Sequence, residues 1–108
     1  MENVIVNLNL EIAVKMGRFD RDHSGCVGYL PDGTTYKDLV KVFGEPQITN
    51  SRDGKTQVEW IGKINGMAFT IYDYKSDGSF KDNTDWHIGG YETIVADLVK
   101  VYFSYKIS

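Results

Sequence analysis

The chain has little of what disulfides, metal centres and basic nucleic-acid surfaces require. Its 108 residues include one cysteine, two histidines and two prolines. A single Cys26 excludes an internal disulfide, and one cysteine with two histidines does not make a closed zinc site without carboxylates. The 12 Lys and Arg residues are scattered along a chain of formal charge −3, which argues against duplex nucleic acid as the main partner. We therefore expect no metal and no cofactor.

Long apolar runs are also missing. No stretch approaches the roughly 18 apolar residues of a membrane-spanning helix. The first nine residues, with Glu2 and three asparagines, lack the layout of a signal peptide. The composition, 42% apolar and 25% charged, is near the average for globular proteins. The sequence predicts one domain over residues 1–108, with no membrane segment and the cytoplasm as the default compartment.

Apolar residues occupy every even position from Val4 to Val14. This period of two predicts a strand with one buried face over residues 4–14. Such a strand at a sheet edge invites pairing with a second copy, so the sequence favours a homodimer. Residues 17–33 are rich in Gly, Asp, Arg and Ser and are predicted as a loop, with a short strand at 26–30.

Within that loop, Asp20, Asp22, Ser24 and Gly25 copy the first half of a calcium-binding loop. Pro31 stands where the bidentate Glu is required, and no amphipathic helix is evident after it. We interpret the segment as a solvated turn. Cys26, just beyond it, lacks a local setting that marks a reactive thiol, and only the fold decides whether it meets a histidine.

The middle of the chain predicts a short helix. Its apolar stripe has the spacing i, i+3, i+4 and i+7 and consists of Tyr36, Leu39, Val40 and Phe43. Thr35 and Asp38 have the spacing of a capping box. Gly44 stands where a left-handed C-cap is expected, and Pro46 prevents continuation.

A β-hairpin is predicted around Asn65 and Gly66, the strongest local signal for a type I′ turn. The strands cover 56–64 and 67–74, and the register that follows places Glu59 opposite Tyr72. One face is predicted to be core: Val58, Trp60, Ile64, Met67, Phe69 and Ile71. The other is amphipathic and suits a ligand or partner: Gln57, Glu59, Ile61, Thr70, Tyr72 and Tyr74.

The last part predicts a short strand at 84–88, then Gly89 and Gly90, then a helix over 91–105. The apolar stripe of that helix is Tyr91, Ile94, Val95, Leu98, Val101, Tyr102 and Tyr105. With Trp86 in the core and this strand beside the hairpin, His87 lies near Glu59 and Tyr72. These elements predict an α+β fold: an antiparallel sheet of about four to five strands, with a short helix and a C-terminal helix packed on it.

The Gly89-Gly90 junction has two interpretations. Free amides in the first turn of a helix can hold a phosphate or carboxylate, with aromatic rings nearby for a base. Alternatively, the glycines only supply the dihedral angles of a tight turn, and Glu92 already satisfies the helix dipole. The candidate ligand-binding residues are Trp86, His87, Gly89, Gly90, Tyr91, Glu59, Tyr72 and Tyr74; no catalytic residue is assigned.

The order of a short helix, Gly44-Glu45-Pro46, a hairpin, Trp86-His87-Ile88-Gly89-Gly90 and a last helix resembles small accessory proteins of bacteriophages and related mobile elements. The resemblance covers roughly residues 34–101. It implies a non-enzymatic inhibitor of a bacterial defence system in the host cytoplasm, which sequesters a nucleotide-type signal.

Three alternatives stay open at this point. One is a protein-interaction inhibitor that occludes a host nuclease or another nucleic-acid-binding effector, with acidic residues mimicking nucleic acid: Asp73, Asp77, Asp82 and Asp85. Another is a small hydrolase that uses His87 with Glu59. A structural or assembly role is the third.

Overall fold

A computed structural model describes residues 10–12, 25–49, 57–74 and 78–107. The described elements, in chain order, are β1 (Leu10–Ile12), β2 (Gly25–Tyr29), α1 (Tyr36–Phe43), β3 (Ile48–Thr49), β4 (Val58–Ile64), β5 (Met67–Tyr72), a 3-10 helix (Phe80–Asp82), β6 (His87–Gly90) and α2 (Thr93–Ile107).

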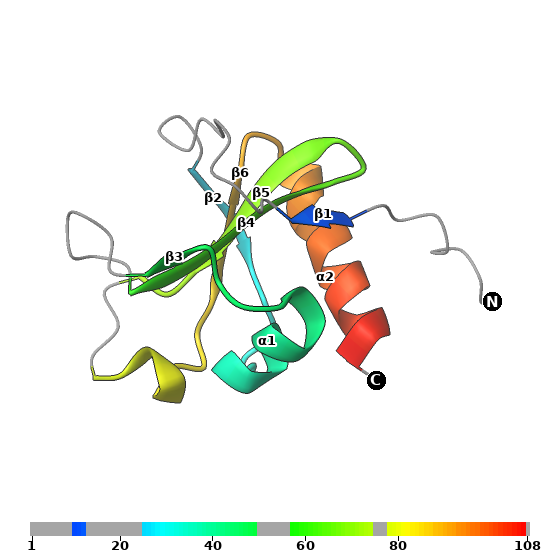
Figure 1. Cartoon of the computed structure of the whole chain (residues 1–108). Helices are drawn as coiled ribbons and strands as arrows, with labels where there is room; N and C mark the ends of the chain where they lie inside the picture. Colours follow the sequence, from blue (N-terminus) through cyan, green and yellow to red (C-terminus); the bar gives the residue numbers. More distant parts are fainter. Residues whose placement is uncertain (1–9, 13–24, 50–56, 75–77, 108) are drawn as a thin grey trace.

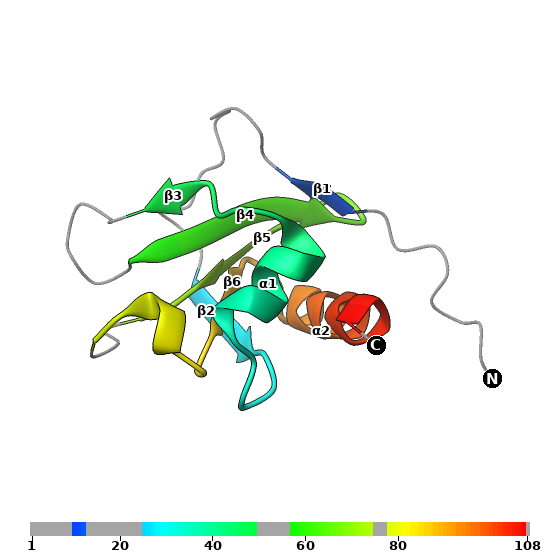
Figure 2. The same ribbon diagram turned by 60° about the horizontal axis from the view of Figure 1, so that its bottom comes forward.

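The strands form one antiparallel sheet in the order β1-β4-β5-β6-β2. β3 pairs with the first part of β4, and β1 pairs with its last part. Both helices lie on one side of this sheet, with α2 against β2, β6 and β5 and α1 against α2 (Figures 1 and 2). The predicted α+β class is confirmed. The described residues contain six strands because two short segments also join β4.

Helix α1 begins and ends where the sequence predicts. The Oγ1 atom of Thr35 accepts a hydrogen bond from the Asp38 N–H (3.2 Å), and the Asp38 carboxylate accepts one from the Thr35 N–H (3.0 Å). Gly44 adopts φ 85° and donates its N–H to Val40 O (2.9 Å). The capping box and the glycine C-cap therefore set both ends of the helix locally.

The β4–β5 hairpin has the predicted turn and register. Asn65 and Gly66 adopt φ values of 51° and 82°, the left-handed conformation that a type I′ turn requires. Glu59 lies opposite Tyr72. The ladder stops there, because the buried carboxylate of Asp73 accepts hydrogen bonds from the Gln57 and Val58 N–H groups at 2.9 and 3.0 Å.

The core lies between the sheet and the two helices. The predicted inner face of the hairpin is buried at Val58, Trp60, Ile64, Phe69 and Ile71, and half-buried at Met67. The Trp60 and Trp86 rings meet edge to face with centroids 5.6 Å apart. Trp60 Nε1 donates to Gly44 O (2.7 Å) and Trp86 Nε1 to Thr34 O (2.9 Å), so both buried indoles tie the sheet to the ends of α1.

The predicted boundary between the last strand and the last helix was wrong. β6 runs through both glycines, because Gly89 and Gly90 pair with Thr70 and Phe69 of β5. Helix α2 begins at Thr93, two residues later than expected.

The predicted buried stripe of this helix was also wrong in part. Four of its members are exposed: Tyr91, Ile94, Val101 and Tyr105. Val95 is buried as predicted, and the side that packs on the sheet also carries Ala96, Val99 and Phe103, which the predicted stripe did not include. Apolar residues lie around most of the circumference of α2, so periodicity alone does not select the buried side.

The described residues test the predictions for the first third of the chain only in part. β1 forms a piece of the predicted strand over 4–14 and lies at a sheet edge. The rest of that strand and the calcium-like segment at 20–24 lie outside the described residues, and the homodimer stays a prediction. The short strand expected at 26–30 is present as β2, one residue earlier. Within the described ranges, neither helix has the length and apolar character to cross a bilayer.

Candidate functional site

A row of directly opposed residues crosses four strands of the sheet. Tyr29 of β2 lies opposite His87 of β6, His87 lies opposite Tyr72 of β5, and Tyr72 lies opposite Glu59 of β4. Directly opposed residues of antiparallel strands point to the same side. Because Ile88, next to His87, is buried in the core, this row faces away from the helices.

The imidazole of His87 contacts three tyrosine rings. The distance between ring centroids is 4.8 Å to Tyr29, 5.3 Å to Tyr72 and 5.6 Å to Tyr74. Tyr29 and Tyr74 are 53% and 41% exposed, whereas Tyr72 and His87 are half-buried. We call these four residues the tyrosine–histidine face.

Cys26 lies at the edge of the tyrosine–histidine face. Its Sγ atom is 3.7 Å from His87 Nδ1, and the residue is exposed. The register of β2 against β6 shifts between Cys26 and Gly28, which makes a β-bulge. Residues three positions apart normally point to opposite sides of a strand, and the bulge brings Cys26 and Tyr29 to the same side.

Burial and the Cys26 thiol control the ionisation of two phenols in this face. Burial raises the pKa of Tyr72 to about 12, and Cys26, Glu59 and Tyr29 act in the same direction. A hydrogen bond with Cys26 raises the pKa of Tyr29. Both phenols are therefore neutral at physiological pH and keep an O–H group that can donate.

The two glycines of β6 are explained by close approach on opposite sides of the sheet. A Cβ atom at Gly89 would lie 2.6 Å from Thr70 Oγ1 and 3.3 Å from Tyr72 Cε1. At Gly90 it would lie 2.6 Å from Val95 Cγ1. Gly89 thus leaves room for the hydroxyl of Thr70 and the ring of Tyr72, and Gly90 allows α2 to pack closely on the sheet.

The predicted ligand-binding residues divide between the two sides of the sheet. Those on the side of the tyrosine–histidine face are Glu59, Tyr72, Tyr74, His87 and Gly89, of which Glu59 is only 7% exposed. Trp86 is fully buried in the core, Gly90 packs against α2, and Tyr91 is exposed beyond the end of β6.

Sequence reasoning did not place Tyr29 or Cys26 at this site. Alternation along a strand predicts that Cys26 and Tyr29 point to opposite sides, and the bulge between Cys26 and Gly28 reverses that pattern. Gly28 was the available signal, since a glycine inside a strand often marks a bulge. Its own requirement is close packing, because a Cβ atom there would lie 2.7 Å from Ala96 Cβ.

The geometry also bears on the alternatives to ligand capture. Tyr72 stands between Glu59 and His87, so the two residues considered for a hydrolase are two strand spacings apart, about 10 Å.

The four aspartates considered for mimicry of nucleic acid do not share one environment. Asp73 is fully buried, whereas Asp82 and Asp85 are exposed and Asp77 lies outside the described residues. Among the described side chains, no group of three or more His, Cys, Asp or Glu residues could hold a metal ion.

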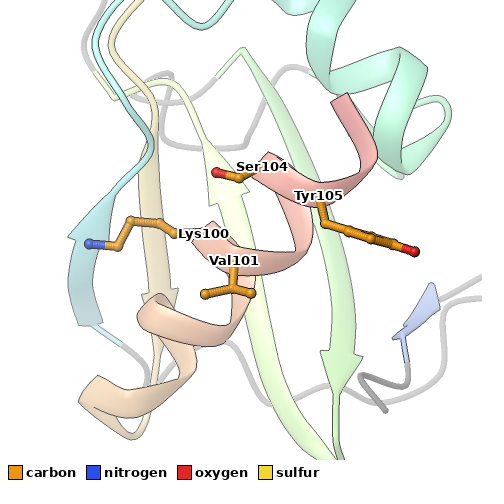
Figure 3. A pocket seen from close by; sticks show the side chains of 4 residues that line it. All are labelled: Lys100, Val101, Ser104 and Tyr105. Atoms are coloured by element: carbon orange, nitrogen blue, oxygen red, sulfur yellow. The ribbon is translucent and has the colours of Figure 1, made fainter. Parts of the chain in front are cut away.

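A separate hollow of about 380 Å³ lies on the outer side of α2 (Figure 3). It is lined by Lys100, Val101, Ser104 and Tyr105. The side chains of Lys100 and Tyr105 diverge from the helix in different directions. This hollow belongs to the helical side of the molecule, and it contains none of the predicted ligand-binding residues.

The fold therefore defines an α+β protein whose antiparallel sheet is covered by helices on one side and carries a tyrosine–histidine cluster on the other. Comparison of the chain with family models, curated proteins and solved structures finds no match.

Proposed function

We propose that the tyrosine–histidine face binds a nucleotide-type ligand by stacking on its base. The observation that carries this proposal is the exposure of Tyr29 and Tyr74 on either side of His87, whose ring both contact. Stacking of a base on an aromatic side chain contributes about 1–3 kcal/mol. Tyrosine also adds little conformational entropy cost, because its side chain has few rotatable bonds.

Polar contacts to such a ligand would come from the side chains of the same face. The neutral phenols of Tyr29 and Tyr72 can donate hydrogen bonds to a base edge or a phosphate, and His87 can donate or accept. The sequence suggested that backbone amides next to Gly89 and Gly90 would hold a phosphate at the start of the last helix. Because both glycines belong to β6 and α2 begins only at Thr93, we expect the side chains of the tyrosine–histidine face to make these contacts instead.

The biological role we propose is sequestration without turnover. The resemblance to bacteriophage accessory proteins supports an inhibitor that captures a nucleotide signal of a bacterial defence system in the host cytoplasm. Bacteria that carry such a system and express the protein are then expected to become sensitive to phage infection. Tyr74→Ala should lose this effect, and Tyr105→Ala should keep it.

Calorimetric titration with cyclic and linear nucleotides, followed by chromatographic recovery of the ligand, tests the binding step. We expect one nucleotide to bind with Kd below roughly 10 μM, about −7 kcal/mol. Tyr74→Ala should weaken binding about tenfold through lost stacking. The matched control is Tyr105→Ala, an exposed tyrosine on α2, which should leave Kd unchanged. Failure of every nucleotide to bind, or recovery of a hydrolysed product, contradicts the proposal.

A further inference from the structure

The proposed binding function leaves one nucleophile unused, the thiol of Cys26, which lies at the edge of the tyrosine–histidine face next to the imidazole of His87. Cys26 Sγ and His87 Nδ1 are 3.7 Å apart, although the residues are separated by 61 positions in the sequence. We infer that they form a thiol–imidazole pair, which makes Cys26 a site of covalent modification by low-molecular-weight disulfides.

The sheet positions this pair so that a reagent can reach the sulfur. Cys26 lies opposite Gly89, which has no side chain to cover it, and the bulge in β2 turns the thiol toward the exposed side. The thiol donates to Gly28 O at 3.4 Å, and His87 Nδ1 lies 3.7 Å from the sulfur and can accept the thiol proton in the tautomer that carries its proton on Nε2. Only the imidazole can take up the proton when the sulfur reacts.

The phenols of Tyr29 and Tyr72 also interact with the Cys26 thiol. Hydrogen bonding with Cys26 contributes to the raised pKa of both Tyr29 and Tyr72. Both phenols stay protonated at pH 7 and belong to residues on the same side of the sheet as Cys26, so their O–H groups can serve as donors to the negative charge that develops on sulfur. Exposure to solvent and an adjacent histidine are two features that reactive thiols share.

The reaction is a thiol–disulfide exchange. The Cys26 sulfur attacks one sulfur of a disulfide R–S–S–R, so that a new bond from Sγ forms and the S–S bond of the reagent breaks. The thiol proton passes to His87 Nδ1 and then to the leaving thiolate, which departs as RSH. Cys26 is oxidised to a mixed disulfide, and the other half of the reagent is reduced to a thiol.

The test is the rate of modification at pH 7. Cys26 is the single cysteine of the chain, so an increase in intact mass reports this residue alone. The probes are hydroxyethyl disulfide and iodoacetamide, applied to the folded chain and to the chain unfolded in urea, with N-acetylcysteine to correct for the effect of urea. General-base assistance predicts that the folded chain reacts about tenfold faster or more.

Two variants separate the imidazole from simple exposure. His87→Gln should lower the folded rate to that of the unfolded chain. A thiol moved to α2, as Ser104→Cys combined with Cys26→Ser, should also react at the unfolded rate, since the one described histidine, His87, lies on the other side of the sheet.

The inference is overturned if folded wild type reacts no faster than the unfolded chain, or if a folded His87→Gln keeps the full rate. Should His87→Gln fail to fold, the folded-to-unfolded ratio of wild type and the relocated thiol decide the question. None of these measurements involves a nucleotide, so failure of the proposed binding function leaves their outcome unaffected.

Discussion

Tyr72 and His87 face each other across β5 and β6, with ring centroids 5.3 Å apart and the ring planes inclined by 31°. Each residue is half-buried, so the contact joins a polar surface to the interior of the sheet. This contact links the hairpin to β6 and anchors the exposed rings of Tyr29 and Tyr74 around one imidazole.

The alkaline stability of the protein should depend on Tyr72. Its pKa is about 12 in the folded chain, against an ordinary 10.0, because burial disfavours the phenolate. The folded chain thus holds this proton more tightly than the unfolded chain, and the resulting stabilisation is complete below about pH 10 and lost as the pH rises toward 12. In Tyr72→Phe, we expect the free energy of unfolding to fall less steeply over that range.

The ultraviolet absorbance of phenolate checks the same group directly. Wild type should show one tyrosine that ionises near pH 12, and Tyr72→Phe should lack it. Tyr105→Phe, which removes an exposed ring on α2, should retain it. A late titration that persists in Tyr72→Phe would refute the assignment.

Replacement of Gly90 by alanine should destabilise the fold. The added Cβ would lie 2.6 Å from Val95 Cγ1 and 3.3 Å from Ala68 O, and a β-branched side chain on a helix has little rotamer freedom to move away. Overpacking of this kind lowers the free energy of unfolding by about 1–3 kcal/mol, as measured by urea denaturation.

Gly25→Ala provides the control for this substitution. Gly25 pairs directly with Gly90, and a Cβ atom there would meet no heavy atom of the described structure within 4 Å. Its effect should stay within about 0.5 kcal/mol. Equal destabilisation by both substitutions would show that packing against α2 is not the cause.

Asp73 should be required for stability, not for binding. Its buried carboxylate accepts hydrogen bonds from Gln57 N–H and Val58 N–H. Asp73→Ala removes that acceptor from both groups, and the free energy of unfolding should fall by about 2–4 kcal/mol. Asp73→Asn, which keeps an acceptor oxygen, should lose less, and the exposed Asp82→Ala should stay within about 0.5 kcal/mol. If Asp73→Ala leaves the free energy of unfolding unchanged, Asp73 does not have this role.

Removal of the N-cap of α1 should lower the free energy of unfolding by less than the loss of Asp73. Thr35 Oγ1 accepts from Asp38 N–H at 3.2 Å, and loss of such a cap costs about 1 kcal/mol. Thr35→Ala should lower the urea midpoint accordingly, whereas Thr35→Ser, which keeps the hydroxyl, should stay close to wild type. If the serine and alanine variants are equally destabilised, the hydrogen bond is not what Thr35 contributes.

The elements predicted most closely are those whose signals are local. The ends of α1 follow from Thr35, Asp38 and Gly44, which act within a few residues of one another. The hairpin follows from Asn65-Gly66, and its register then places Glu59 opposite Tyr72 by alternation alone. The position of His87 in the same row needed one further assumption, that β6 lies beside β5, and the structure confirms it.

The features that the sequence could not reveal depend on contacts between distant segments. Helix α2 is apolar on several sides, and only docking against Gly28 and Gly90 selects the side that carries Ala96 and Val95. Cys26 and Tyr29 share a side because of a bulge that is defined only when β2 pairs with β6. The spacing of residues indicates neither fact, and Gly28 is the one local signal for the bulge.

The sequence by itself determined the α+β class, the capped helix α1 and the hairpin, because capping, turn geometry and alternation are properties of short segments. Only the tertiary structure decided the composition of the tyrosine–histidine face and the contact of Cys26 with His87. Those depend on strand order and on a register shift, and the pairing of strands that are distant in the sequence is set by the packing of the whole sheet on its helices.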